Sequence, residues 1–170
     1  MAGKKHGKDV LNHTLLVLLR LLHENGIKNW FIEYGTLLGI VRDRSCIEGD
    51  DDVDIVVCQS QRSALKEMLK KNGFQLKIDR PTILKTSDTP EYASIDFYLA
   101  TIDNEGNFHE KHDNIFWTRC YKSPTQRDLL NIEWAGEKVF IPNNYEEKLK
   151  NHYGDWQIPQ NKKGKRNSKL

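Results

Sequence analysis

An acidic run that leads without a break into an apolar segment carries the clearest chemistry in this sequence. The run reads Asp50-Asp51-Asp52-Val53-Asp54-Ile55-Val56-Val57. Side chains alternate across a strand, so Asp50, Asp52 and Asp54 are expected to share one face. Carboxylates this close repel one another, and hard divalent cations such as Mg²⁺ and Mn²⁺ offset the repulsion because they prefer oxygen ligands. The pattern therefore predicts a metal-dependent phosphoryl-transfer site.

The alternative interpretation of the acidic run is a solvated surface loop. The β-branched residues that surround Asp54 argue against a loop, because they are typical of a buried strand. An EF-hand fits poorly as well. Counted from Asp50, the glycine position of that motif holds Ile55 and the closing glutamate position holds Gln61.

A candidate phosphate-binding element precedes the acidic run. Residues 30–34 are predicted to form a strand, Gly35 and Thr36 a tight turn, and residues 37–42 the start of a short helix. The backbone N–H groups of such a turn, the helix dipole and the Thr36 hydroxyl would together hold a phosphate.

Arg42 is the nearest cation to this turn, and its guanidinium can hold phosphate with two parallel hydrogen bonds. We therefore predict that Arg42 binds phosphate. The alternative is an ion pair with Asp43 or Asp50.

A third carboxylate is expected from a neighbouring strand. Asp96 lies within residues 94–101, an apolar segment with the alternation of a strand, where a carboxylate without a partner is costly to desolvate. It therefore needs a metal or, as the alternative, a salt bridge to Lys85 or Arg80. Together with the aspartates of the acidic strand, Asp96 could ligate two metals, or one metal and a polarised acceptor hydroxyl.

The elements that must position these residues can be predicted from periodicity and turn residues. Helices are predicted over 9–25, 61–72 and 145–149, and strands over 30–34, 53–57, 74–78, 82–85 and 94–101. Further hairpins are predicted around 103–112 and over 132–141. The expected fold is α+β, a mixed sheet flanked by helices, with the active site at the sheet edge on the glycine turn and the acidic strand.

Two sets of motifs resemble one known family, the LicD/fukutin group of the nucleotidyltransferase superfamily. The core set is Gly35-Thr36-Leu37-Leu38-Gly39, Arg42 and Asp50-Asp51-Asp52-Val53-Asp54. The closing set is Phe140-Ile141-Pro142, Tyr145, Leu149, Tyr153-Gly154-Asp155-Trp156 and Pro159. The resemblance spans most of residues 30–159 and implies a nucleotidyltransferase-like fold.

The resemblance also implies an activity, which is transfer of a phosphoalkyl group such as phosphocholine or ribitol phosphate. The expected donor is CDP-linked, the expected acceptor is a sugar hydroxyl of a glycan, and the expected cofactor is Mg²⁺ or Mn²⁺. Asp52, Asp54 and Asp96 would be the catalytic and metal-binding carboxylates, with Asp50 as a further candidate ligand. Two alternatives stay open: nucleotidyl transfer from a nucleoside triphosphate to RNA or a small molecule, and a catalytically silent glycan- or metal-binding module.

Length and charge predict one domain and a tail. The chain has 170 residues, 38% hydrophobic and 29% charged, which is typical of one globular domain, and we assign residues 1–160 to it. Residues 161–170 hold five basic residues and no acid, and are predicted to be a disordered tail. Because the tail lacks interleaved aromatic residues, nucleic acid is not an expected partner.

The remaining features predict a cytoplasmic protein. The sequence contains no run of about 18 apolar residues, which a membrane span requires, and its start does not resemble a signal peptide. Cys46, Cys58 and Cys120 show no framework spacing and are expected to be reduced. A zinc site that used Cys120 with His109 and His112 would lack an evident fourth ligand.

Overall fold

The computed structural model describes residues 3–159, so the predicted tail at 161–170 lies outside the described residues. The helices are α1 (Lys8–Glu24), α2 (Tyr34–Asp43), α3 (Arg62–Lys71) and α4 (Tyr145–Tyr153), and a 3-10 turn lies at Gln59–Gln61. The strands are β1 (Trp30–Ile32), β2 (Asp52–Cys58), β3 (Leu76–Arg80), β4 (Ile83–Thr86), β5 (Ser94–Ile102), β6 (Phe108–Glu110), β7 (Ile115–Trp117), β8 (Leu130–Trp134) and β9 (Glu137–Ile141). No helix in this part of the chain is long and apolar enough to cross a membrane.

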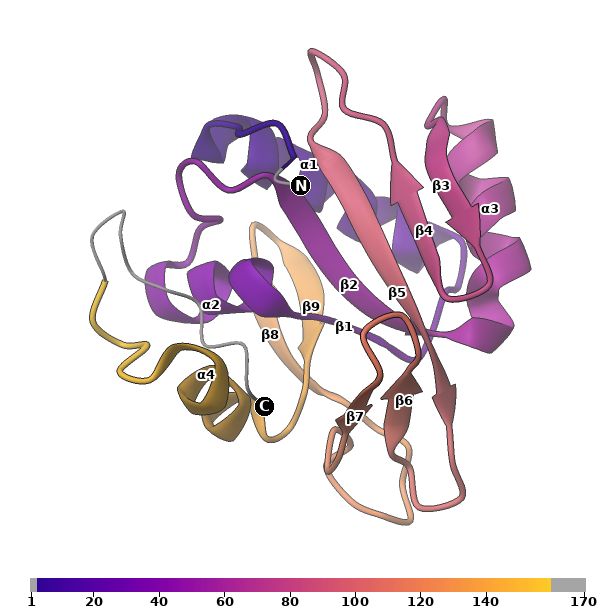
Figure 1. Ribbon diagram of the computed structural model, residues 1–170, viewed down its shortest axis with the longest axis vertical. Coiled ribbons are helices and arrows are strands. Elements are labelled where there is room, and N and C mark those ends of the chain that lie inside the picture. Colours follow the sequence, from indigo (N-terminus) through magenta and orange to yellow (C-terminus); the bar gives the residue numbers. More distant parts are fainter. Residues whose placement is uncertain (1–2, 160–170) are drawn as a thin grey trace.

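The main sheet is mixed and has seven strands, and its main path runs β1-β2-β5-β4-β3 (Figure 1). Strands β2 and β5 pair in parallel at the centre, whereas their other neighbours pair antiparallel. The predicted α+β fold with a mixed sheet is confirmed. The acidic strand is central, however, so the prediction of a site at the sheet edge is wrong: the aspartates lie where two central strands begin.

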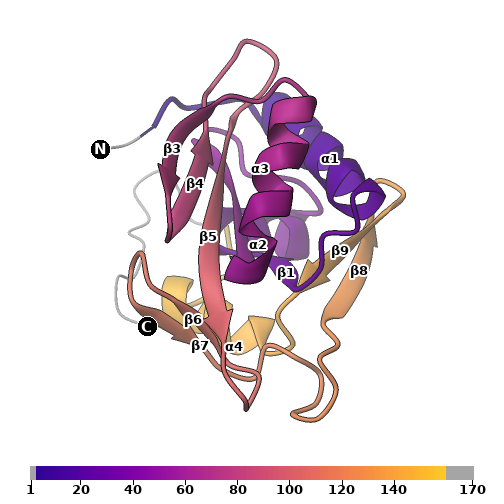
Figure 2. The same ribbon diagram turned by 90° about the vertical axis from the view of Figure 1, so that its right-hand side faces the viewer.

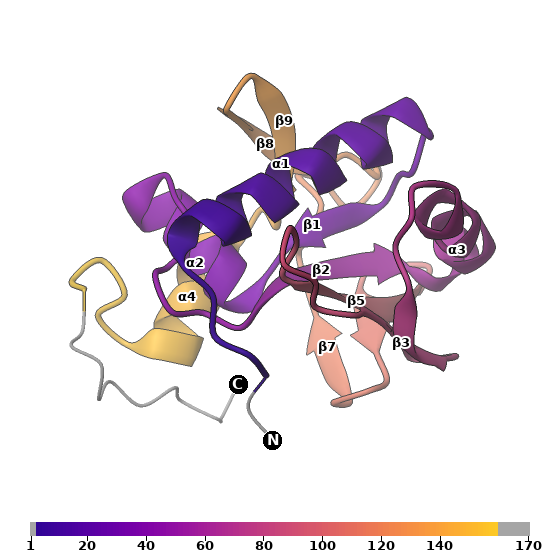
Figure 3. The ribbon, with the colours of Figure 1, turned by 90° about the horizontal axis from the view of Figure 1, so that it is seen from above.

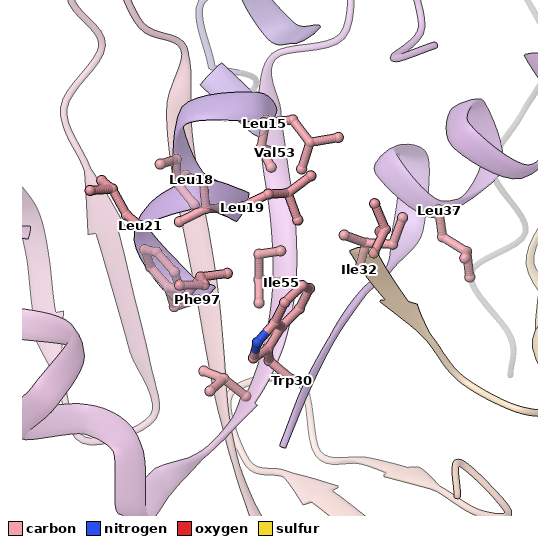
Figure 4. Packing of buried hydrophobic residues seen from close by; sticks show 14 of the residues in the cluster. Leu15, Leu18, Leu19, Leu21, Trp30, Ile32, Leu37, Val53, Ile55 and Phe97 are labelled. Atoms are coloured by element: carbon pink, nitrogen blue, oxygen red, sulfur yellow. The ribbon is translucent and has the colours of Figure 1, made fainter. Parts of the chain in front are cut away.

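Helices α1 and α3 cover one face of this sheet (Figures 2 and 3). Leucines at helical spacing on α1 pack against alternate residues of β2, including Val53 and Ile55, and against Phe97 of β5 (Figure 4). Burial of each such side chain stabilises the fold by about 1.5 to 3 kcal/mol. Because this alternation turns the apolar residues of β2 toward α1, it turns Asp52 and Asp54 to the opposite face.

The opposite face carries a second apolar cluster toward the ends of β1 and β5. Its largest members are Phe31, Phe108, Trp117 and Tyr121, and the ring centroids of Phe31 and Phe108 lie 5.2 Å apart. Helix α4 closes this region beside α2, with His152 stacked on Trp117 at 5.8 Å between ring centroids. The cluster therefore leaves the start of β2 and β5 as the open part of this face.

The β8–β9 hairpin packs outside the main sheet against β1 and α1. The rings of Trp30 and Phe140 meet edge to face at 5.0 Å, and the Trp134 indole N–H donates a hydrogen bond to the Arg44 carbonyl at 2.8 Å. These contacts hold the residues after α2 against the body of the fold.

The start of α2 differs from the prediction. Tyr34 was expected to end a strand before a tight turn at Gly35 and Thr36, but the helix begins at Tyr34. The side chain of Glu33 accepts a hydrogen bond from Tyr34 N at 3.1 Å and thereby caps the helix. Tyr34 has a φ of 55°, in the left-handed region, which costs a residue with a side chain about 1 to 2 kcal/mol.

Candidate functional site

The parallel pairing of β2 with β5 brings the three predicted carboxylates together. Asp54 lies directly opposite Asp96 in the register, and Asp52 projects from the same face two residues earlier. Oxygen atoms of Asp52, Asp54 and Asp96 all lie within 4.8 Å of one another. Asp54 and Asp96 are only 6% and 5% exposed. Such a set of hard oxygen ligands could hold a divalent metal ion.

Helix α2 fixes the position of Asp54. The Thr36 hydroxyl oxygen accepts a hydrogen bond from Asp54 N at 2.9 Å, and Glu33 N donates to the Asp54 carbonyl at 3.1 Å. Thr36 is 1% exposed. Its clearest contact therefore anchors the acidic strand to the helix, whereas phosphate binding by Thr36 stays a prediction.

The Asp50 carboxylate occupies the space that a side chain at position 35 would fill. A side chain added at Gly35 would collide with the Asp50 carboxylate, so a larger residue here would displace it. Asp50, Asp51 and Asp52 form a second set of carboxylates whose oxygen atoms lie within 4.8 Å. Asp50 thus lies beside the main set, and its role as a further metal ligand stays a prediction.

Lys85 contributes a cation to the same site. It lies on β4 opposite Asp96, and its ammonium nitrogen is 2.8 Å from Asp96 Oδ1 and 3.6 Å from Asp52 Oδ2. The salt bridge that the sequence left as the alternative for Asp96 is therefore present within the carboxylate cluster. Burial lowers the pKa of Lys85, but the hydrogen bond and the charge of Asp96 outweigh it and raise the pKa. One ammonium against three carboxylates leaves room for a further cation.

The electrostatics of the cluster favour a bound cation. Burial raises the pKa of Asp52 most, the Asp96 carboxylate raises it further, and Lys85 opposes the shift. Burial, together with the charges of Asp54 and Asp96, also raises the pKa of Tyr98. The Tyr98 phenol is therefore kept neutral beside the carboxylates, as a hydrogen-bond donor.

A pocket of about 660 Å³ opens over the carboxylates. Its described lining residues come from five regions of the chain: Lys5, Gly35, Leu38, Ile47, Glu48, Gly49, Asp50, Asp51, Asp52, Asp54, Tyr98 and Tyr153. Tyr98 follows Asp96 by two residues on β5, so strand alternation could have identified it. Lys5 and Tyr153 are remote in sequence: no pattern indicated Lys5, and the closing motif that contains Tyr153 did not place it at the pocket.

Arg42 is paired with its neighbour in the sequence. Its guanidinium bonds both carboxylate oxygens of Asp43, at 2.8 and 2.9 Å, and it donates to the Trp156 carbonyl at 3.4 Å. Arg42 is not among the described residues that line the pocket. The structure therefore contains the Asp43 ion pair that the sequence left as the alternative.

The aromatic segment at 114–121 contributes to the fold instead of the pocket. Trp117 and Tyr121 are buried in the second apolar cluster, and Phe116 is 60% exposed. Within residues 3–159, the groups of side chains close enough to share a metal ion consist of aspartates, and the suggested zinc ligand Cys120 belongs to none of them.

Comparison with known proteins identifies related sequences and folds. The model of the family described as LicD/FKTN/FKRP, nucleotidyltransferase domain, matches residues 27–144, a range that holds every predicted site residue. An uncharacterized protein of Rickettsia typhi is 42% identical over 60 residues, which cover 34% of this chain and 19% of that protein. The chain therefore aligns with only about a fifth of the length of this relative.

Two solved proteins share the fold at low sequence identity. The lincomycin-bound lincosamide antibiotic adenylyltransferase LnuA has a TM-score of 0.60 and 12% identity, over 80% of this chain and 82% of its own. ANT(2")-Ia in complex with adenylyl-2"-tobramycin has a TM-score of 0.52 and 14% identity, over 76% of this chain and 68% of its own. Both likenesses establish a nucleotidyltransferase-like fold.

Proposed function

Because the chain belongs to the LicD/FKTN/FKRP family of nucleotidyltransferase domains, we propose that it transfers a phosphoalkyl group from a CDP-linked donor to a sugar hydroxyl of a glycan. Its family and fold make it a transferase of the nucleotidyl- or phosphotransferase kind. The observation that carries the proposal is the convergence of Asp52, Asp54 and Asp96 beneath an open pocket.

In this proposal Asp52 and Asp54 hold Mg²⁺ or Mn²⁺, with Asp96 as the third carboxylate. When bound, the metal ion offsets the negative charge of the donor diphosphate and polarises its oxygens. The chemistry of the site fits a divalent metal ion, because the candidate ligand atoms are carboxylate oxygens and Lys85 balances only part of their negative charge.

The reaction joins the acceptor oxygen to the phosphorus that bears the alkyl group. The bond from that phosphorus to the bridging oxygen breaks, and CMP leaves with the electron pair. The proton of the acceptor hydroxyl passes to a carboxylate, for which we propose Asp96. A hydrogen bond from Lys85 to Oδ1 orients the Asp96 carboxylate within the cluster.

The pocket wall suits the other parts of such a donor. Tyr98 and Tyr153 offer aromatic surface for a base or a sugar ring, and Leu38 and Ile47 add apolar surface. The neutral Tyr98 phenol adds a hydrogen-bond donor near the carboxylates. A cytidine moiety and a glycan acceptor both present ring faces and hydroxyl groups that fit this combination.

Nucleotidyl transfer is the second candidate function. It is favoured by the shared fold with proteins such as LnuA, whose description is lincosamide antibiotic adenylyltransferase. The same carboxylates would serve both reactions, because both stabilise charge on phosphate. A silent binding module is less well supported, since the three predicted carboxylates lie within 4.8 Å of one another and two of them, Asp52 and Asp54, line the pocket.

The leaving group distinguishes the two reactions. We expect CMP release from CDP-choline, CDP-ribitol or a related donor, with Mn²⁺ or Mg²⁺ present, and faster release when a glycan acceptor is added. Asp54→Asn should abolish the release. Nucleotidyl transfer would instead release pyrophosphate from CTP or ATP, and the CDP-linked donors would stay intact.

Asp128→Asn is the matched control. Asp128 is exposed, and its carboxylate lies 3.3 Å from the Lys122 ammonium, outside the pocket lining. It should retain the parent rate. Pyrophosphate release with intact CDP-linked donors after long incubation would reject the leading function in favour of nucleotidyl transfer.

A further inference from the structure

The segment that precedes α1 lies against the acidic loop of the candidate site. The backbone of His6 donates a hydrogen bond to the Asp50 carbonyl at 2.9 Å and accepts one from Gly49 N at 2.9 Å. These two bonds tie the backbone of His6 to both Gly49 and Asp50. Residues 3–7 are therefore joined to the loop that carries Asp50.

Two further contacts anchor the same segment. The His6 ring, 8% exposed, places Nε2 at 2.6 Å from Asp88 Oδ1, and Asp88 Oδ1 also accepts from Ser94 N at 3.2 Å. On the other side, Gly3 N donates to Asp51 Oδ2 at 3.0 Å. The segment thus connects the loop before β2 with the start of β5, the two strands that carry the carboxylates.

Lys5 lies between these anchors and lines the pocket. It is the only lysine or arginine among the described pocket-lining residues. No ion pair within 4.0 Å joins its ammonium to a carboxylate in the described part of the chain, whereas Arg42 and Lys85 are both paired. Its backbone is held in place while its charged end keeps the reach of a long side chain.

We propose that Lys5 binds the phosphates of the donor, so that the segment at 3–7 is part of the active site. The inference rests on the proposed function and deepens it, because it assigns the phosphate-binding cation of the same pocket. A diphosphate that approaches Asp50, Asp51 and Asp52 meets like charge. An ammonium at the pocket wall reduces that repulsion and gives the phosphate oxygens a charged hydrogen-bond donor.

The test compares the binding of CDP, with Mn²⁺ present, to the parent, Lys5→Met and Lys4→Met by isothermal titration calorimetry. Lys4 is the neighbouring exposed lysine and does not line the pocket. Lys5→Met should weaken CDP binding roughly ten-fold, the effect of one charged hydrogen bond. It should also reduce the salt dependence of the affinity. Lys4→Met should match the parent, and both variants should keep the parent melting temperature.

The outcomes separate this inference from the function on which it rests. If the parent binds CDP and Lys5→Met binds it equally well, Lys5 does not hold phosphate and the inference is wrong while the proposed function stands. An equal loss in Lys4→Met would also overturn it, because the effect would then be general surface charge. If the parent does not bind CDP at all, the proposed function fails and the assignment of Lys5 fails with it.

Discussion

At the scale of single residues, the site buries more negative charge than its neighbouring cations neutralise. Burial raises the pKa of Asp52 most, and the neighbouring carboxylates of Asp96 and Asp51 raise it further, so Asp52 holds its proton more tightly than an exposed aspartate does. Lys85 relieves part of this cost through its contacts with Asp96 and Asp52. A divalent metal ion would relieve the rest.

The raised pKa of Asp52 predicts how the stability of the metal-free protein depends on pH. A carboxyl group whose pKa is raised on folding stabilises the fold fully below its unfolded pKa, about 3.9. This contribution is lost as pH rises through the folded pKa. We therefore expect Asp52→Asn to gain about 2 kcal/mol relative to the parent between pH 5 and pH 9 in EDTA, measured by urea unfolding.

Added Mn²⁺ provides the control for this prediction. The ion should raise the melting temperature of the parent but not that of Asp52→Asn, because only the parent keeps the full set of ligands in the native state. If the difference in unfolding free energy between Asp52→Asn and the parent in EDTA does not change with pH, the ionised Asp52 carboxylate is not destabilised in the folded protein.

At the scale of elements, the junction between α2 and β2 determines where the proposed metal ligand Asp54 lies. The Asp54 backbone bonds on both sides to the start of α2, through Thr36 and Glu33. The strained backbone of Tyr34 lies in the same turn. Strain of this kind persists only where the surrounding contacts hold it, and it occurs often at functional sites.

Thr36→Val tests this junction. The substitution keeps the shape of the side chain but leaves the buried Asp54 N–H without its acceptor, which should cost about 2 kcal/mol in urea unfolding. It should also weaken Mn²⁺ binding, because Asp54 is then held less firmly. Thr36→Ser keeps the hydroxyl and should bind Mn²⁺ like the parent. If Thr36→Val also binds Mn²⁺ like the parent, the junction does not position the metal ligands.

Sequence patterns were sufficient for the elements that carry the carboxylates. Alternation of apolar residues identified β2 and β5, and the same alternation correctly assigned Asp52 and Asp54 to the face opposite Val53 and Ile55. The start of α2 was missed because Gly35 is typical of turns, whereas here it makes room for Asp50 inside a helix. That contact joins residues from two elements and has no local signal.

At the scale of the whole molecule, the pocket collects residues that local patterns cannot bring together. Backbone hydrogen bonds between the amino-terminal segment and the acidic loop position Lys5 at the pocket, and helix α4 contributes Tyr153. Arg42 is paired with Asp43 and is not among the described residues that line the pocket. Long-range packing therefore decides which cations and aromatic rings face the carboxylates, and sequence alone could not predict it.

We propose that Asp52, Asp54 and Asp96 form one metal centre that faces a nucleotide-binding pocket. A crystal structure of the protein with Mn²⁺ and CDP would locate the metal ion by anomalous scattering. We expect Mn²⁺ bound by Asp52 and Asp54 at about 2.1 Å, with the CDP phosphates on the same ion and Asp96 beside it. If Mn²⁺ is held only by Asp50 and Asp51, or CDP binds away from this pocket, the three aspartates do not form the metal centre of a nucleotide site.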